Sequence, residues 1–175
     1  AVGTDGTPAG TLLRAPGRPL DVLDLGCGTG LVGDALAARR QGMGEPPAVD
    51  AAMALVGVDL SPAMLAEARK KGRYRGLHVA DIESWLAAAN ANDFDLVVAA
   101  DMFIYIGELD PVFRGVARTL RQAGKFVFSV ETCSGQGYRL LPSGRYAQSD
   151  AYVSRLASRH GFTLLAREDA EIRRG

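Results

Sequence analysis

The sequence has no net charge, little cysteine and no long apolar run. Its 20 basic and 20 acidic side chains balance, so the chain as a whole has no electrostatic attraction to DNA or RNA. No apolar stretch approaches the roughly 18 residues that a membrane span needs, and the first residues lack the pattern of a signal peptide. We therefore expect a cytoplasmic protein that binds neither nucleic acid nor membrane.

The two cysteines, Cys27 and Cys133, lie far apart and form no Cys-x-x-Cys pair. This spacing argues against a metal site and against a disulfide framework, and it suits a reducing compartment. We expect both to be small buried thiols, and we predict no metal site.

The length of 175 residues, with 47% hydrophobic and 23% charged side chains, fits one folded domain. The chain begins at Ala1 rather than Met, and residues 3–8 are rich in glycine, threonine and proline. Such a composition is typical of linkers. We predict a linker or partial segment over residues 1–19 and one domain over residues 20–175, and we expect the chain to be a piece of a longer protein.

Strand patterns and helix patterns alternate along the chain. The expected strands are 20–25, 54–59, 77–80, 95–100, 125–130 and one that begins at 162. The expected helices are 31–39, one that begins at 62, a short one around 85–87, one that begins at 110, and one capped by Ser149 and closed by Gly161. This alternation predicts an α/β fold with a parallel sheet covered on both faces.

The helix that begins at Pro62 carries the clearest local signals. Ser61 can cap it, proline suits its first position, and Met64, Leu65 and Ala68 form an apolar stripe. Residues 132–148 are instead predicted to form a long polar, glycine-rich loop.

A glycine cluster follows the first expected strand, and two patterns overlap in it. The sequence Gly28-x-Gly30-x-x-Gly33 matches the fingerprint of dinucleotide-binding proteins, but such a pattern alone is a weak signal. The sequence Asp24-x-Gly26-x-Gly28-x-Gly30 matches the pattern of proteins that bind S-adenosylmethionine (SAM). In both cases backbone N–H groups and a helix N-terminus face the ligand.

The acidic residue ahead of the glycines favours the second pattern. A carboxylate at Asp24 would repel the two negative charges of a pyrophosphate. SAM has no phosphate and carries an ammonium and a sulfonium group, both of which a carboxylate attracts. Asp59 ends the second strand, where a carboxylate can accept hydrogen bonds from ribose hydroxyls of either NAD or SAM.

The run from Val22 to Gly30 closely resembles the first motif of class I SAM-dependent methyltransferases, and the similarity extends over about residues 20–130. It implies a Rossmann-like sheet of order 3-2-1-4-5-6, with the family's seventh, antiparallel strand absent from this chain. It also implies that SAM is the cofactor. The residues that it assigns to cofactor binding are Asp24, Gly26, Gly28, Gly30, Asp59, Leu60, Met64, Asp81, Ile82 and Ala100.

Within this resemblance Asp81 takes the place of the residue that binds the adenine amino group, and Ile82 frames the ring. Asp81 is equally placed to cap a helix. Residues 138–146 further resemble the methyltransferase half of bacterial proteins with tetratricopeptide repeats, although this chain has no such repeat.

We expect a methyltransferase whose acceptor is a small molecule rather than a nucleic acid, with a protein acceptor left open. The turn at Ala100 lacks the Asn/Asp-Pro-Pro-Tyr signature of enzymes that methylate amines of bases. Methyl transfer depends mainly on alignment, and Asp101 and Tyr105 are the candidate bases. Two alternatives stay open: an NAD-dependent oxidoreductase and a non-catalytic SAM-binding module.

Overall fold

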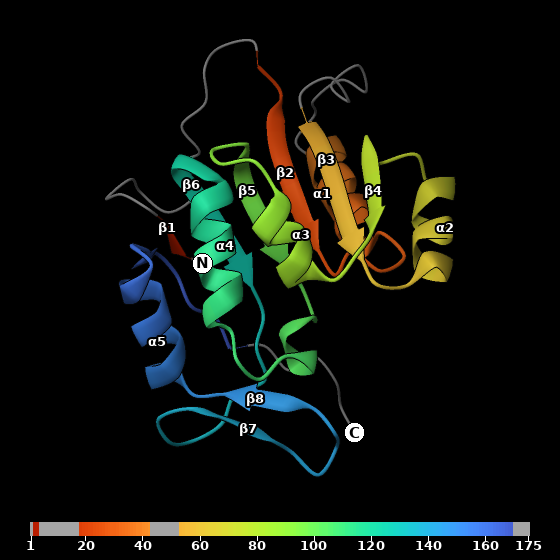
Figure 1. Cartoon of the computed structure of the whole chain (residues 1–175). Coiled ribbons are helices and arrows are strands. Elements are labelled where there is room, and N and C mark those ends of the chain that lie inside the picture. Colours follow the sequence, from red (N-terminus) through yellow and green to blue (C-terminus); the bar gives the residue numbers. More distant parts are fainter. Residues whose placement is uncertain (1, 4–17, 43–52, 170–175) are drawn as a thin grey trace.

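A computed structural model describes residues 2–3, 18–42 and 53–169 of the chain. A seven-stranded sheet forms its centre, with α3 and α4 in front and α1 behind it in Figure 1. The strands of the sheet are β1 (Val2–Gly3), β2 (Leu20–Leu25), β3 (Met53–Asp59), β4 (Gly76–Val79), β5 (Phe94–Ala99), β6 (Leu120–Phe128) and β9 (Thr163–Leu164). The helices are α1 (Leu31–Gly42), α2 (Pro62–Lys70), α3 (Ile82–Ala88), α4 (Asp110–Thr119) and α5 (Asp150–Arg159), with a 3-10 turn η2 (Phe103–Tyr105).

The order of strands across the sheet is β4-β3-β2-β5-β6-β1-β9. The first five are parallel to one another and stand in the order 3-2-1-4-5. This confirms the α/β class predicted from the alternation of elements and the Rossmann-like arrangement implied by the resemblance.

The far edge of the sheet differs from the expected order. The sixth expected strand, β9, does not pair with β6, because β1 lies between them and is antiparallel to both. An antiparallel strand thus occupies the position where the sequence predicted none. It comes from Val2 and Gly3, within the predicted linker, and the rest of that stretch up to residue 17 lies outside the described residues.

The helix termini follow the predicted capping signals. The side chain of Ser61 accepts a hydrogen bond from the Met64 N–H at the start of α2, and Ser149 does the same for α5. The predicted apolar stripe of α2 is only partly buried: Leu65 and Ala68 are in the core, but Met64 is 46% exposed.

The predicted loop 132–148 contains a second, small sheet. Strands β7 (Tyr138–Leu140) and β8 (Tyr146–Gln148) pair as an antiparallel hairpin. They lie at the bottom of the view, below α4 and α5, and β8 contacts η2 (Figure 1). The prediction of a loop was wrong for residues 138–140 and 146–148.

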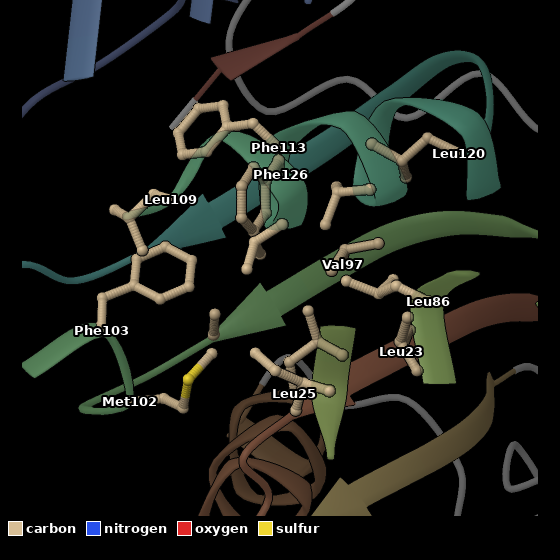
Figure 2. Close-up of a cluster of buried hydrophobic side chains, with 14 of the residues drawn as sticks. Leu23, Leu25, Leu86, Val97, Met102, Phe103, Leu109, Phe113, Leu120 and Phe126 are labelled. Atoms are coloured by element: carbon tan, nitrogen blue, oxygen red, sulfur yellow. The ribbon is translucent and has the colours of Figure 1, made fainter. Parts of the chain in front are cut away.

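The core lies between the sheet and the helices of its front face. Phe113 of α4 and Phe126 of β6 are fully buried, and their rings pack edge to face at 5.4 Å between centroids. Figure 2 shows the strand residues Leu23 and Val97 in the same cluster. This packing fixes the strands whose carboxyl ends carry the candidate site.

Candidate functional site

The candidate residues gather at the carboxyl edge of the parallel strands. The glycine loop follows β2, Asp59 ends β3, Asp81 follows β4 and Ala100 follows β5. Since parallel strands end at the same edge, the topology brings these four segments together. This edge is the usual position of ligand sites in open α/β sheets.

The glycine loop has a backbone that other residues rarely adopt. Gly26, Gly28 and Gly30 have φ angles of 67°, 53° and 84°, in the left-handed region where a side chain is unfavourable. A Cβ atom at Gly26 would also stand 2.4 Å from the Cγ of Met102, in the turn after β5. The loop therefore packs directly on that turn, and a side chain at Gly26 would separate the two.

Asp59, at the end of β3, is hydrogen-bonded to the glycine loop and to the residue that caps α2. Its Oδ2 accepts a hydrogen bond of 2.9 Å from the Gly28 N–H, and its Oδ1 accepts one of 2.8 Å from the Ser61 N–H. The sequence predicted a ribose ligand here but gave no sign of this structural role. Each oxygen retains a second lone pair, so the two roles are compatible.

Asp24 is the most buried of the predicted site residues, with 1% of its surface exposed. Its Oδ2 accepts a hydrogen bond of 2.6 Å from the Tyr74 hydroxyl. Its Oδ1 is buried and accepts no hydrogen bond from any described residue. Burial raises the pKa of this carboxyl to about 6, opposed by the Tyr74 hydrogen bond and assisted by the negative charge of Asp59.

The electrostatic character of this edge is therefore negative. Within residues 18–38 and 53–169, no lysine, arginine or histidine forms an ion pair with Asp24 or Asp59. A buried carboxylate without a cation is costly in free energy. Such a site stabilises a positively charged ligand and disfavours a diphosphate.

Apolar side chains are exposed beside these carboxylates. Leu60 is 68% exposed and Met64 is 46% exposed, both in the segment that follows Asp59. Ile82 differs from them, because its side chain belongs to the buried core. A flat apolar group such as a nucleobase would therefore meet the side chains of Leu60 and Met64, but mainly the backbone of Ile82.

Asp81 acts as a helix cap. Its Oδ1 accepts a hydrogen bond of 2.9 Å from the Ser84 N–H at the start of α3. The capping role that the sequence allowed is confirmed. Because the side chain is also exposed, its Oδ2 remains accessible to a ligand.

The turn after β5 carries the remaining candidates. Ala100 and Asp101 are exposed, and Asp101 has a φ of 54°, which is unusual for a residue with a side chain. The Asp101 N–H donates to the Ser129 hydroxyl at 2.8 Å, which holds this conformation. Tyr105, on η2, is 72% exposed.

The hairpin β7–β8 is attached to this turn. Gln148 is fully buried, and its Nε2 donates to the carbonyl oxygens of Phe103 at 3.2 Å and Ile106 at 2.8 Å. The sequence did not identify this contact, nor the one between Tyr74 and Asp24, because neither residue belongs to a local motif. The hairpin adds the exposed side chains of Tyr138 and Leu140 to this end of the molecule.

The histidines and cysteines stand apart from the site or are inert. His160 is the C-cap residue of α5 and contacts Asp110 at 3.1 Å. His78 lies on the edge strand β4 and is exposed, with its ring 5.7 Å from that of Trp85. Cys27 is buried, whereas Cys133 is only partly so.

The described residues contain no group of three or more histidine, cysteine or acidic side chains arranged to hold a metal ion. The same residues include no helix with the length and apolar character required to cross a bilayer.

Comparison with known proteins identifies a family. The model of a family described as a methyltransferase domain matches residues 23–128. The chain is 29% identical over 150 residues to a malonyl-[acyl-carrier protein] O-methyltransferase of Paenibacillus, covering 83% of this chain and 50% of the relative. It is 29% identical over 135 residues to a ubiquinone biosynthesis O-methyltransferase of Thiobacillus denitrificans, covering 75% of this chain and 53% of the relative. The chain thus spans about half the length of these relatives.

A solved structure supports the fold. A SAM-dependent methyltransferase from Mesorhizobium loti superposes with a TM-score of 0.59 at 21% identity, over 85% of this chain and 77% of that one. At this identity the likeness concerns the arrangement of the strands and helices alone.

Proposed function

The chain belongs to the methyltransferase-domain family, and from that premise we propose that it binds SAM at the glycine loop and transfers the methyl group to a small-molecule acceptor. The observation that carries this proposal is the uncompensated negative charge of Asp24 and Asp59. The oxidoreductase alternative finds no support, because the matching family and the relatives are methyltransferases. A negative pocket is also unsuited to the pyrophosphate of NAD.

The residues at the carboxyl edge fit the chemical groups of SAM. The buried Oδ1 of Asp24 accepts no hydrogen bond from the described residues, and an ammonium group would supply the missing donor. We assign Asp59 to the ribose hydroxyls, and Leu60 and Met64 to the faces of the adenine. Asp81 and the backbone of Ile82 are assigned to the adenine edge.

The glycine loop and Ala100 complete the proposed cofactor site. Gly26, Gly28 and Gly30 allow the backbone to approach the ligand closely, and Ala100 lies where the strand β5 ends. When bound, SAM supplies an electrophilic methyl group on a sulfonium. The protein aligns the acceptor with it and excludes water, and such orientation can lower a barrier by roughly 7–11 kcal/mol.

The acceptor side is proposed to lie between the turn after β5 and the hairpin β7–β8. Its exposed aromatic and apolar side chains, Tyr105, Tyr138 and Leu140, suit a small organic acceptor better than a highly charged polymer. Both relatives are named O-methyltransferases, and we propose an oxygen nucleophile here as well. A carboxylate acceptor would need no base, whereas a hydroxyl acceptor would lose its proton to Asp101 or Tyr105.

Two finer proposals accompany this one. The sequence of residues 138–146 resembles the methyltransferase half of proteins with tetratricopeptide repeats. We propose that the corresponding residues of those proteins form a hairpin at the same position in the fold. A cytoplasmic location is proposed because the two cysteines are free thiols, as is usual in a reducing compartment.

The test is to incubate the chain with SAM that carries a labelled methyl group and a panel of carboxylic acids and phenols. We expect formation of S-adenosylhomocysteine together with labelled product for at least one acceptor, and none with Asp24→Asn. Binding of SAM without turnover on a broad panel would favour the non-catalytic SAM-binding module. Failure to bind SAM at all would refute the proposal.

A further inference from the structure

The two oxygens of the Asp24 carboxylate have different surroundings. Oδ2 accepts the hydrogen bond of 2.6 Å from Tyr74, a residue 50 positions further along the chain. Oδ1 is equally buried but accepts no hydrogen bond from the described residues. One side of the carboxylate is thus held by the protein, and the other side is left for another donor.

Three glycines make room for the ring of Tyr74. A Cβ atom at Gly30 or Gly57 would lie 3.0 Å from a ring carbon, and one at Gly33 would lie 3.1 Å away. These distances are shorter than ordinary van der Waals contacts between carbon atoms. The ring therefore fits closely between the glycine loop, the start of α1 and β3, and its position is well determined.

This packing also explains why the dinucleotide pattern appears in the sequence. Gly33 completes Gly28-x-Gly30-x-x-Gly33, and a Cβ atom there would meet Tyr74 at 3.1 Å and both Arg73 and Leu55 at 3.2 Å. The packing of these side chains is enough to account for a glycine at this position.

The titratable groups that face Asp24 are Tyr74 from the loop after α2, Cys27 from the glycine loop and Asp59 from the end of β3. Burial raises the pKa of the Cys27 thiol to about 12, and the charges of Asp24 and Asp59 add to the effect. Burial and the charge of Asp24 also raise the pKa of the Tyr74 hydroxyl. Both groups remain protonated at neutral pH, so Tyr74 is a hydrogen-bond donor whenever Asp24 is ionised.

We propose that Tyr74 is a positioning residue for the cofactor site: its hydroxyl holds Oδ2 of Asp24, so that the ionised carboxylate presents Oδ1 to the cationic end of the ligand. This inference rests on the proposed function for the identity of the ligand. It goes beyond that function because it concerns a residue outside the glycine motif, which acts through Asp24 and does not touch the cofactor.

The proposal has a consequence for pH. A hydrogen bond to the charged form stabilises that form, so the Tyr74 hydroxyl lowers the pKa of Asp24. In Tyr74→Phe the ring still fills the space between the glycines, but Asp24 ionises at a higher pH. A cationic ligand then binds with full affinity only at a higher pH than in the wild-type protein.

The experiment is a calorimetric titration with SAM at several values between pH 5.5 and 7.5. For the wild-type chain we expect affinity to rise with pH until Asp24 is ionised. For Tyr74→Phe we expect the rise to move upward by about 1 pH unit, the scale of one hydrogen bond to a charged group. Binding should then be about fivefold weaker near pH 6 and approach about tenfold weaker at lower pH.

Tyr152→Phe is the control variant. Tyr152 is buried, whereas Tyr74 is half-buried, and the Tyr152 hydroxyl donates to the Glu108 carboxylate at the same distance of 2.6 Å. The variant loses this hydrogen bond and the one that the hydroxyl accepts from the Leu109 N–H. Both lie away from Asp24, so the pH profile for SAM binding should equal that of the wild type. A wild-type profile in Tyr74→Phe, or equal weakening at every pH, would overturn the proposal.

A second readout separates this proposal from the proposed function. The pKa of the Asp24 carboxyl can be followed by carbon-detected NMR without any ligand, and we expect a higher value in Tyr74→Phe than in the wild-type chain. An unchanged value would overturn the role of Tyr74 even if SAM binds. A raised value in a chain that does not bind SAM would uphold that role and refute the proposed cofactor.

Discussion

Strand β2 carries a buried carboxylate near each end, and the side chains around the two carboxylates have opposite character. Asp21, near the amino end, is 6% exposed, and Asp24, near the carboxyl end, is 1% exposed. Three guanidinium groups lie within 3.0 Å of the Asp21 carboxylate, those of Arg18, Arg75 and Arg121. The Asp24 carboxylate has only a tyrosine hydroxyl among the described residues.

The same contrast appears in the pKa values. At the amino end, burial raises the pKa of Asp95, but hydrogen bonds from Arg18 and from the Asp21 N–H outweigh this effect. The pKa of Asp95 is therefore lowered. At the carboxyl end, burial raises the pKa of Asp24 to about 6. Charges at the amino end are neutralised within the protein and serve the fold, whereas those at the carboxyl end are left to be neutralised by a ligand.

The largest expected effect lies at the amino end. Arg121 contacts both Asp21 at 3.0 Å and Asp95 at 3.2 Å, so Arg121→Met removes one cation from each of two buried carboxylates, which both keep Arg18 as a partner. We expect a loss of about 3 kcal/mol in the free energy of unfolding, measured by urea denaturation at pH 7.

A surface arginine provides the control for this prediction. In Arg167→Met the lost partners, Asp150 and Asp169, are both exposed, and we expect no measurable change in the free energy of unfolding. If the two substitutions change the free energy of unfolding equally, the ion pairs at the amino end of the sheet contribute no more than ion pairs on the surface.

The next effect concerns the pH dependence of stability at the carboxyl end. The pKa of Asp24 is about 6 in the folded chain, above its ordinary value of 3.8. The proton therefore stabilises the fold below pH 4, and this contribution is lost as the pH rises through 6. Relative to Asp24→Asn, the wild-type chain should lose up to about 3 kcal/mol between pH 4 and 7, measured by urea denaturation.

Asp95→Asn is the counterpart at the other end of the sheet. Since the pKa of Asp95 is lowered, its contribution to stability is present above its ordinary pKa and is lost only in more acid solution. The difference between this variant and the wild-type chain should stay constant from pH 5 to 7. A constant difference for Asp24→Asn as well would remove the contrast between the two ends.

Asp59→Ala should weaken SAM binding by about 2 kcal/mol, the scale of lost hydrogen bonds to a charged group. The substitution also releases the Gly28 N–H from its partner. Asp59→Asn retains one acceptor oxygen, so we expect an intermediate affinity by calorimetry. An unaltered affinity in Asp59→Ala would exclude Asp59 from the site.

The smallest effect separates two roles of Asp81. Asp81→Ala removes the cap of α3 and should cost about 1 kcal/mol of stability. Asp81→Ser keeps a capping oxygen, so its thermal stability should stay close to that of the wild type while its affinity for SAM falls. If Asp81→Ser binds SAM as tightly as the wild type, Asp81 is a structural cap alone.

The extent to which the sequence predicted these features depends on how local their signals are. The glycine loop, the Ser61 cap and the five parallel strands follow from residues that are neighbours in the chain. The contact between Tyr74 and Asp24 joins positions 50 residues apart, and no local pattern indicates it. It could be foreseen only from the shape of the space between β2, β3 and α1.

Other errors have the same origin. Met64 fits an apolar stripe, but it lies in the first turn of α2, shortly after the carboxyl end of β3, and it is 46% exposed. The hairpin strands have three residues each, too few for a periodic signal, and they are held in place through the distant contacts of Gln148. The sequence therefore indicated which residues gather at the carboxyl edge of the sheet, but not the distant contacts that hold them there.

The most direct test of the central claim is calorimetry of the wild-type chain at pH 7.5 with SAM and, separately, with NAD. An uncompensated pair of carboxylates at the glycine loop predicts that SAM binds at least roughly a hundredfold more tightly than NAD, a difference of about 2.7 kcal/mol. Binding of NAD with equal or greater affinity would contradict the account.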